Sequence, residues 1–311
     1  MNKGYTIFEL LVAMALSLII GAGLYTFYTT VFRENISKGS LVKEEQEAFI
    51  LVDQLIKDFQ SIGFGVDYNN LKMQTGSDCS LSSNNPVLTK CVIKTNDGTN
   101  ENDRLEFLSL SAATDEVNSG CWGFTDINGK VNLFNSYDIL GRPCNNSGKY
   151  LVMDTSKRLK DVSYDPSNPN PNYKNMYAFY VGSKSYPNDF KVSYFPDNTN
   201  LPECAPGTFN LQKRTGTTTI SPVISCVLNF KIRYIGNDGN FYDKLNDINN
   251  LQGLKLCMIV QVGREQSTPE NPPNYSANGG CPTFDFSINP KWRYYRWVVI
   301  EQSIPLKNIR Q

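Results

Sequence analysis

The chain has 311 residues, of which 30 are basic and 30 acidic, and none is histidine. The zero net charge argues against a dedicated nucleic-acid-binding protein, although a local basic patch would not show in the total. The lack of histidine excludes Ser-His-Asp and Cys-His catalysis and every zinc site that needs an imidazole. Only 19% of the residues are charged, which suits a β-rich domain with many loops better than a helical enzyme.

The N-terminal segment contains an uncharged run from Leu10 to Phe32, with Lys3 before it. At 1.5 Å per residue, these roughly 23 residues can cross a hydrocarbon core of about 30 Å as a helix. The run is too long for the apolar core of an ordinary signal peptide, and Lys3 favours an N-terminus on the cytoplasmic side. We therefore predict a membrane-spanning helix followed by an exported domain.

Glu9 is a charged residue beside this run, where a carboxylate at the bilayer centre would cost about 2.5–3.5 kcal/mol. It lies either in the headgroup region or beside a cation inside a helical assembly. The segment from Gly4 to Glu9 resembles the prepilin leader of the type IV pilin and type II pseudopilin superfamily, although Tyr5 stands where phenylalanine is usual. The resemblance implies that a prepilin peptidase cuts after Gly4 and methylates the amine of Tyr5. It also implies that Glu9 neutralises an N-terminal amine during filament assembly.

The helix is predicted to continue beyond the membrane, because apolar residues recur at spacings of three and four along one face. These residues are Leu41, Ala48, Val52, Leu55, Phe59 and Ile62. Gly63 and Gly65 are expected to end the helix. The resulting division is a leader at 1–4, a transmembrane or filament-core helix at 5–32, an amphipathic helical extension at 33–64 and a periplasmic or extracellular β-rich domain at 65–311.

The remainder of the chain alternates short apolar segments, rich in β-branched and aromatic residues, with loops rich in asparagine, glycine and proline. The expected strands are 87–94, 104–110, 150–153, 176–181, 190–195, 223–235, 254–262 and 292–303. The predicted fold class is therefore α+β. With the resemblance, it is a type IV pilin fold in which a long N-terminal helix carries a large, disulfide-stapled β-sheet domain.

Eight cysteines follow the apolar run, and none of them forms a C-x-x-C motif. In an exported domain they are expected to form disulfides, with reduced core thiols as the alternative. Eight cysteines allow 105 pairings, so the sequence does not determine which form. Pairing of nearest neighbours would close short loops between adjacent strands. These pairs are Cys79–Cys91, Cys121–Cys144, Cys204–Cys226 and Cys257–Cys281.

Three further segments narrow the resemblance to PilW-like minor pilins, with J-type pseudopilins second. Residues 51–64 are similar to the end of the spine helix in these proteins, and 251–264 and 295–308 are similar to their later strands. The resemblance implies a structural protein without a cofactor or catalytic residues. It would prime assembly of a type IV pilus and lie at or near the filament tip. The alternatives are a pseudopilin of a type II secretion system and a tip module for adhesion or DNA uptake.

The same resemblance implies the location and partners of the protein. It would lie in the bacterial inner membrane before assembly, with its N-terminus in the cytoplasm, and then in the periplasm and the extracellular pilus. Its partners would be the prepilin peptidase, the other minor pilins, the major pilin, the pilus assembly platform and a tip adhesin.

One polar segment offers oxygen ligands at alternate positions, the kind of ligand that calcium prefers. Its acidic residues are Asp97, Glu101 and Asp103. The glycine and terminal glutamate of an EF-hand are misplaced, so we expect a solvated polar loop without a bound metal.

A second candidate is a basic and aromatic cluster that includes Trp292, Arg293 and Arg296. Cations interleaved with aromatic side chains can bind single-stranded nucleic acid through stacking and phosphate contacts. The favoured interpretation is a strand with an aromatic core face and a basic exposed face, which alternation of side chains along a strand explains.

Overall fold

The computed structural model describes residues 7, 14, 16–28, 50–67, 73–75, 88–94, 101–114, 119–144, 148–199, 201–217, 219–245, 247–276 and 278–309. The chain divides into two compact units, Met1–Ala48 and Phe49–Gln311, and we call the second the globular unit. In the first unit, residues 16–28 are helical and exposed. No helix within the described residues combines the length and the apolar character that a membrane crossing requires. The predicted span at 5–32 lies only partly within the described residues.

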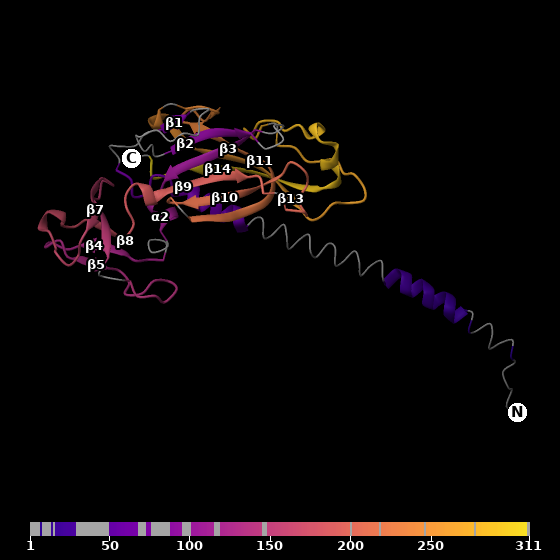
Figure 1. The fold of residues 1–311 in the computed structure, drawn as a ribbon, viewed down its shortest axis with the longest axis horizontal. Coiled ribbons are helices and arrows are strands. Elements are labelled where there is room, and N and C mark those ends of the chain that lie inside the picture. The colour runs from indigo at the N-terminus through magenta and orange to yellow at the C-terminus, as the bar shows by residue number, and fades with distance from the viewer. Residues whose placement is uncertain are drawn as a thin grey trace. The chain divides into compact units, whose positions relative to one another are not determined.

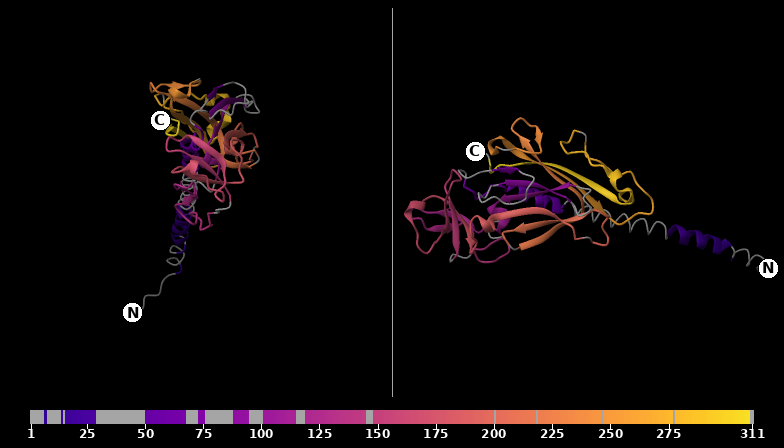
Figure 2. Two further views of the ribbon diagram at one scale, coloured as in Figure 1. Left: turned by 90° about the vertical axis from the view of Figure 1, so that its left-hand side faces the viewer. Right: turned by 45° about the horizontal axis from the view of Figure 1, so that its top comes forward.

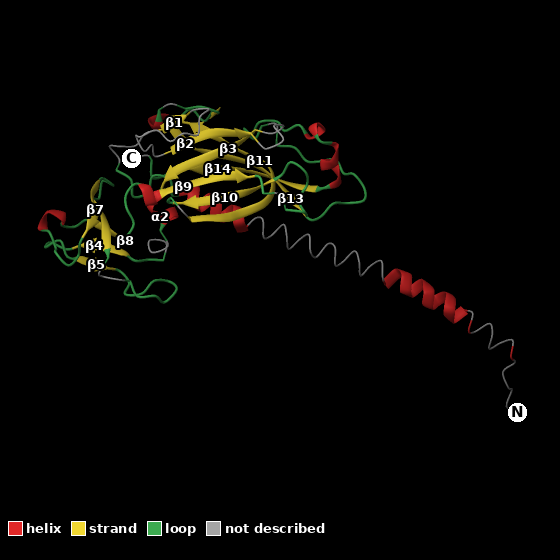
Figure 3. Ribbon diagram, viewed as in Figure 1, coloured by secondary structure: helices red, strands yellow, loops and turns green. Residues whose placement is uncertain are grey.

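The globular unit contains two β-sheets (Figures 1 and 3). The larger has the strand order β1-β2-β3-β9-β10-β11-β13-β14, with β12 paired to β11. Its strands are β1 (Met73–Thr75), β2 (Leu88–Lys94), β3 (Glu101–Leu108), β9 (Lys191–Asp197), β10 (Phe209–Thr215), β11 (Thr219–Gly236), β12 (Phe241–Tyr242), β13 (Leu251–Val262) and β14 (Arg296–Pro305). The β1–β2 pair is parallel, and the other pairs of this sheet are antiparallel.

The smaller sheet is antiparallel, with the order β5-β4-β8-β6-β7. Its strands are β4 (Trp122–Thr125), β5 (Val131–Leu133), β6 (Lys149–Met153), β7 (Leu159–Tyr164) and β8 (Tyr177–Gly182). It lies at one end of the globular unit, as the views of Figure 2 also show. The described short helices are α2 (Leu110–Ala113), η2 (Pro171–Tyr173), η3 (Asn188–Phe190), η4 (Ile248–Asn250), η5 (Phe286–Ile288) and η6 (Pro290–Tyr294).

One face of the larger sheet is covered by the helix at residues 50–60. Phe59 is fully buried, and its ring meets those of Phe107 and Tyr194 edge-on, with centroids 5.9 Å and 5.3 Å away. Gly63 and Gly65 have φ angles of 81° and 78° and turn the chain out of the helix, as the sequence predicts. The main hydrophobic core thus lies between this helix and the sheet.

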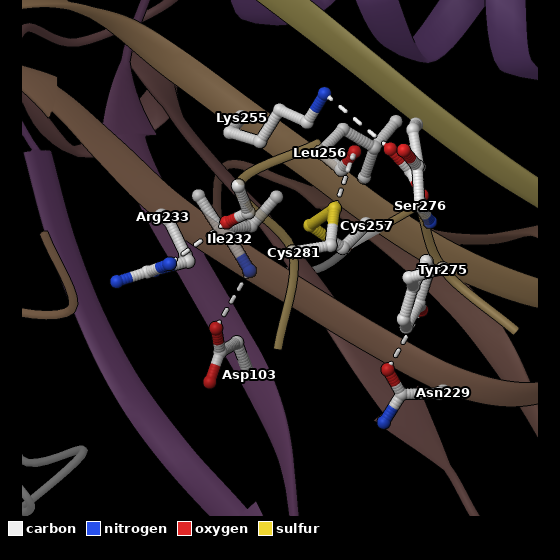
Figure 4. Close-up of a disulfide and its surroundings, with 12 residues drawn as sticks. Asp103, Asn229, Ile232, Arg233, Lys255, Leu256, Cys257, Tyr275, Ser276 and Cys281 are labelled. Atoms are coloured by element: carbon white, nitrogen blue, oxygen red, sulfur yellow. Dashed lines mark hydrogen bonds and ion pairs between the residues drawn. A yellow bond between two sulfur atoms is a disulfide. The ribbon is translucent and has the colours of Figure 1, made fainter. Parts of the chain in front are cut away.

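The segment between β13 and β14 covers the opposite face of the sheet with a second hydrophobic cluster. Alternate residues of β13 point to the two faces, so Met258 belongs to the main core while Cys257 and Ile259 belong to this second cluster. Figure 4 shows how Cys281 holds the covering segment to Cys257, and how the Tyr275 hydroxyl donates to Asn229 on β11 at 2.8 Å.

The described disulfides follow the nearest-neighbour pairing expected from the sequence. They are Cys121–Cys144, Cys204–Cys226 and Cys257–Cys281. Cys91 is also disulfide-bonded, and its predicted partner Cys79 lies outside the described residues. These three disulfides confirm the predicted cross-linking of the β-rich domain.

Candidate functional site

The residues predicted for leader cleavage, methylation and filament assembly lie outside the part of the chain that the structure describes. These are Gly4, Tyr5 and Glu9. Their cleavage, methylation and assembly roles remain predictions from the sequence.

Asp58 fixes the helix at 50–60 to the larger sheet through a buried ionic contact. Its side chain is 5% exposed, and its Oδ2 atom lies 2.5 Å from the Nζ atom of Lys213 on β10. The same oxygen accepts a hydrogen bond from the hydroxyl of Tyr194 on β9 at 2.5 Å. Burial, followed by the negative charge of Asp58, holds the pKa of Tyr194 well above its usual value. Helical spacing does not show which acidic residue faces a cation, so the sequence pattern does not single out Asp58.

Two of the three candidate calcium ligands, Glu101 and Asp103, lie on β3 in different surroundings. Asp97 lies outside the described residues, Glu101 is exposed at the start of β3, and Asp103 is buried. Asp103 accepts the backbone N–H of Ile232 at 2.7 Å (Figure 4). Lys90 donates to the carbonyl oxygen of the same residue, also at 2.7 Å. The side chains of Asp103 and Lys90 therefore form hydrogen bonds with the backbone N–H and carbonyl groups of Ile232 on β11. Ile232 lies beyond the part of β11 that pairs with β10.

Two lysine side chains lie near the carboxylate of Asp103. Its carboxylate lies 3.7 Å from Lys90 and 3.6 Å from Lys231. Burial lowers the pKa of Lys90, an effect that the Asp103 carboxylate partly opposes. Within the described residues, no group of three or more acidic or cysteine side chains is placed to hold a metal ion. The carboxylate of Asp103 thus has a structural role between β3 and β11.

The basic and aromatic cluster has buried tryptophans and exposed arginines, as expected, but the predicted strand at 292–303 is wrong at its start. Pro290 and the Asn289 cap begin the 3-10 helix η6 there, and β14 starts only at Arg296. Trp292 is fully buried in the second hydrophobic cluster, and its indole N–H donates to Pro206 at 2.7 Å. It therefore offers no surface to a nucleic-acid base. Arg296 is exposed but lies 3.6 Å from Glu270.

Arg293 is the other exposed cation of the predicted binding face. Its Nη2 atom donates to the side-chain oxygen of Asn271 at 3.2 Å. The backbone of the same residue accepts from Glu270 at 2.7 Å. Arg293 thus helps to hold the covering segment of the second cluster, and it does not lie beside an exposed tryptophan.

A cavity of about 560 Å³ opens between the segment that follows the helix and the smaller sheet. Its apolar wall is formed by Phe64, Trp122, Met153, Tyr177 and Phe179. The lining also includes the polar residues Ser111, Asp154, Thr155, Lys157 and Asn308. The walls of this cavity come from segments far apart in the chain, so no local sequence pattern predicts it.

Residues 1–25 match the family model of the prokaryotic N-terminal methylation motif. The chain carries the prepilin-type N-terminus of the type IV pilin and pseudopilin superfamily. No curated protein matches this pilin-like chain. A type IV-like pilin from Thermus thermophilus is 11% identical, with a TM-score of 0.37, and the match covers 86% of this chain and 97% of that chain. A likeness this low does not bear on fold or function.

The pilin-like chain also presents two apolar side chains on a rigid turn within the loop closed by Cys121–Cys144. Ile139 and Leu140 are 78% and 70% exposed. Asp138 fixes the turn, since its Oδ1 atom accepts the backbone N–H groups of Leu140 at 2.9 Å and Arg142 at 2.8 Å. Exposed apolar residues held in one conformation are typical of contact surfaces.

Proposed function

We propose that the protein is a minor pilin, a structural subunit that primes assembly of a type IV pilus and lies at or near its tip. The observation that carries the proposal is the match of residues 1–25 to the methylation motif. The uncharged run beside Glu9 supports it, because such a segment can hold the subunit in the inner membrane before it joins a filament. The partners are the prepilin peptidase, the major and other minor pilins, and the assembly platform.

The size of the globular unit supports a rare subunit rather than a repeated one. A domain of 263 residues, Phe49–Gln311, is large for a lattice that repeats thousands of times, whereas a tip position leaves room for it. The three described disulfides suit a domain that folds in an oxidising compartment. The function is structural, and no catalytic step is assigned to the chain.

The decisive experiment is the mass of the N-terminal peptide, measured for the full chain with and without a prepilin peptidase. We expect the mature chain to begin at N-methylated Tyr5. The Gly4→Val variant, and wild type without the peptidase, should both retain Met1. A wild-type chain that still begins at Met1 with the peptidase present, or that is cut after the apolar run, would overturn the proposal.

A second measurement separates the minor pilin from the alternatives. Glu9→Gln should be processed normally but lost from sheared surface filaments, where the wild type should be rare relative to the major pilin. Recovery of the wild type only with a secretion complex, and never in surface filaments, would identify a type II pseudopilin instead.

A further inference from the structure

The cavity beside the smaller sheet has several aromatic side chains in its lining. Trp122 on β4 is the cross-strand partner of Phe179 on β8, and their rings lie 6.1 Å apart at 25°. Tyr177 lies two residues before Phe179, so it points to the same face of the sheet, with rings 6.3 Å apart at 21°. The ring of Phe179 therefore lies at a small angle to each of the other two, and Trp122 and Tyr177 are partly exposed.

The cavity also has polar lining residues. The turn between β6 and β7 contributes Asp154, Thr155 and Lys157. Asp154 accepts the backbone N–H of Arg158 at 2.9 Å and lies 3.2 Å from Lys160, so its carboxylate is held in one position. Lys157 is exposed and has a φ angle of 59°.

Asn308 adds an amide to these polar residues. Its side-chain nitrogen donates to the carbonyl of Gln60 at 3.0 Å. This bond orients the amide, and its oxygen is left as an acceptor. The lining thus combines hydrogen-bond donors and acceptors with aromatic side chains.

We propose that this cavity binds a neutral carbohydrate, with one sugar ring stacked on Trp122 and Tyr177. Aromatic faces are negative, so they attract the weakly positive C–H groups on the flat side of a sugar ring. The hydroxyl groups of the sugar would bond to Asp154, Asn308 and the other polar side chains. The volume of about 560 Å³ lies within the roughly 300–1,000 Å³ that is usual for small-molecule sites.

Two other ligand classes fit the lining less well. A phosphate-bearing ligand would need several cations at the site, whereas Lys157 is the single cation among the described lining residues. A wholly apolar ligand, such as a partner's aliphatic side chain, would bury the polar groups without hydrogen bonds, which is costly. The proposal goes beyond the role in filament assembly and does not depend on it.

Tryptophan fluorescence of the full chain tests the proposal directly. Trp122 lines the cavity, while Trp292 and Trp297 are 0% and 5% exposed within the second cluster. We would titrate the protein, in a detergent that contains no sugar, with neutral hexoses, N-acetylhexosamines and their disaccharides. Parallel titrations would use uronic acids, inorganic phosphate and an apolar peptide. A saturable change with the neutral sugars alone is expected.

Substitutions of lining residues test whether the sugar binds in the cavity. Binding measured by calorimetry should weaken roughly tenfold in Trp122→Ala, about 1.4 kcal/mol, and should be unchanged in Arg296→Gln, which alters an exposed cation of the second cluster. If Trp122→Ala does not fold, Lys157→Gly provides the test. Glycine accepts the positive φ angle at this position without strain, and the substitution removes one polar side chain from the cavity. That variant should bind the sugar measurably more weakly.

Three results would overturn the proposal. One is the lack of a saturable response to any neutral sugar. Another is tighter binding of uronic acid, phosphate or the apolar peptide than of the neutral sugars. The last is neutral-sugar binding that is unaffected by the cavity variants. None of these results touches the cleavage at Gly4, so failure of the carbohydrate site is distinguishable from failure of the minor pilin proposal.

Discussion

At the scale of single residues, Asp58 is the charged group on which the helix at 50–60 depends. Removing one partner of a buried ion pair leaves the other charge uncompensated, at a cost of about 3–5 kcal/mol. We therefore expect Asp58→Ala to lower the free energy of unfolding by about that amount, because Lys213 and Tyr194 both lose their acceptor. Urea denaturation of the full chain measures the change.

The matched control for Asp58 lies on the exposed side of the same helix. Asp53 and Lys57 form an ion pair of 2.7 Å, with side chains 62% and 64% exposed. Surface pairs contribute about 0–1 kcal/mol, so Asp53→Ala should have little effect. Equal losses in the two variants would contradict the view that the buried contact fixes the helix.

The raised pKa of Glu106 makes the free energy of unfolding depend on pH. Burial raises the pKa of this carboxyl group, an effect that Arg104, Lys191 and Arg214 partly oppose. The folded chain therefore binds more protons than the unfolded chain between the ordinary pKa of 4.5 and the raised value. Hence the contribution of Glu106 to stability is present at lower pH and is lost as the pH rises through this window.

The variant Glu106→Gln should remove that loss. Its free energy of unfolding, relative to wild type, should increase as the pH rises from below 4.5 towards neutrality and then become constant. Denaturation series at several pH values measure this difference. A relative stability that falls with rising pH would mean that the contact of 3.3 Å with Arg104 outweighs the cost of burial.

At the scale of elements, the turn after the helix depends on glycine for two separable reasons. Gly65 has a φ angle of 78°, and an added Cβ would lie 2.6 Å from the Cβ of Leu110. Gly239 has nearly the same φ angle, 80°, but nothing lies within 4 Å of an added Cβ. Substitution by alanine would therefore strain the backbone at both positions, but it would cause a steric clash only at Gly65.

We expect Gly239→Ala to cost about 1–2 kcal/mol, the strain of a left-handed conformation. Gly65→Ala should cost about 1–3 kcal/mol more, as overpacked sites do. Thermal unfolding of both variants gives the two losses. If the losses are equal, Leu110 moves aside freely and the helix end is less tightly packed than the contacts indicate.

The elements predicted well from the sequence are those with a long, regular pattern. Leu55, Phe59 and Ile62 repeat at helical spacing, and all three are fully buried. Strands β11 and β13 are long apolar segments and were also predicted in part. By contrast, β4 and β5 contain four and three residues, too few to show the alternation on which a strand prediction rests.

The candidate sites were less predictable, because each depends on contacts between distant segments. The spacing of acidic residues around Asp103 resembles a ligand loop locally, but the strand β11 that uses this carboxylate is more than a hundred residues away. Similarly, Trp292 belongs to an apparent basic face in the sequence, but it is buried where the covering segment between β13 and β14 packs against the sheet. The aromatic lining of the cavity combines β4 and β8 with the end of the helix.

At the scale of the whole molecule, the boundary between the two units predicts which part of the chain folds alone. Among the described residues, the main core begins at Val52, and the second unit begins at Phe49. A chain that starts at Phe49, exported to an oxidising compartment, should therefore contain every group that the described cores need. We expect it to form the described disulfides and to unfold at nearly the same temperature as the full chain.

A chain that starts at Gly63 provides the contrasting result. It lacks Leu55, Phe59 and Ile62, and loss of such fully buried side chains costs about 2–5 kcal/mol each, as much together as the roughly 5–15 kcal/mol stability of a whole domain. It also leaves Lys213 without Asp58. We expect this chain to be unfolded by circular dichroism and rapidly degraded by protease. If it folds as well as the chain from Phe49, the helix at 50–60 is dispensable for the globular unit, and its burial serves only to join the domain to the N-terminal segment.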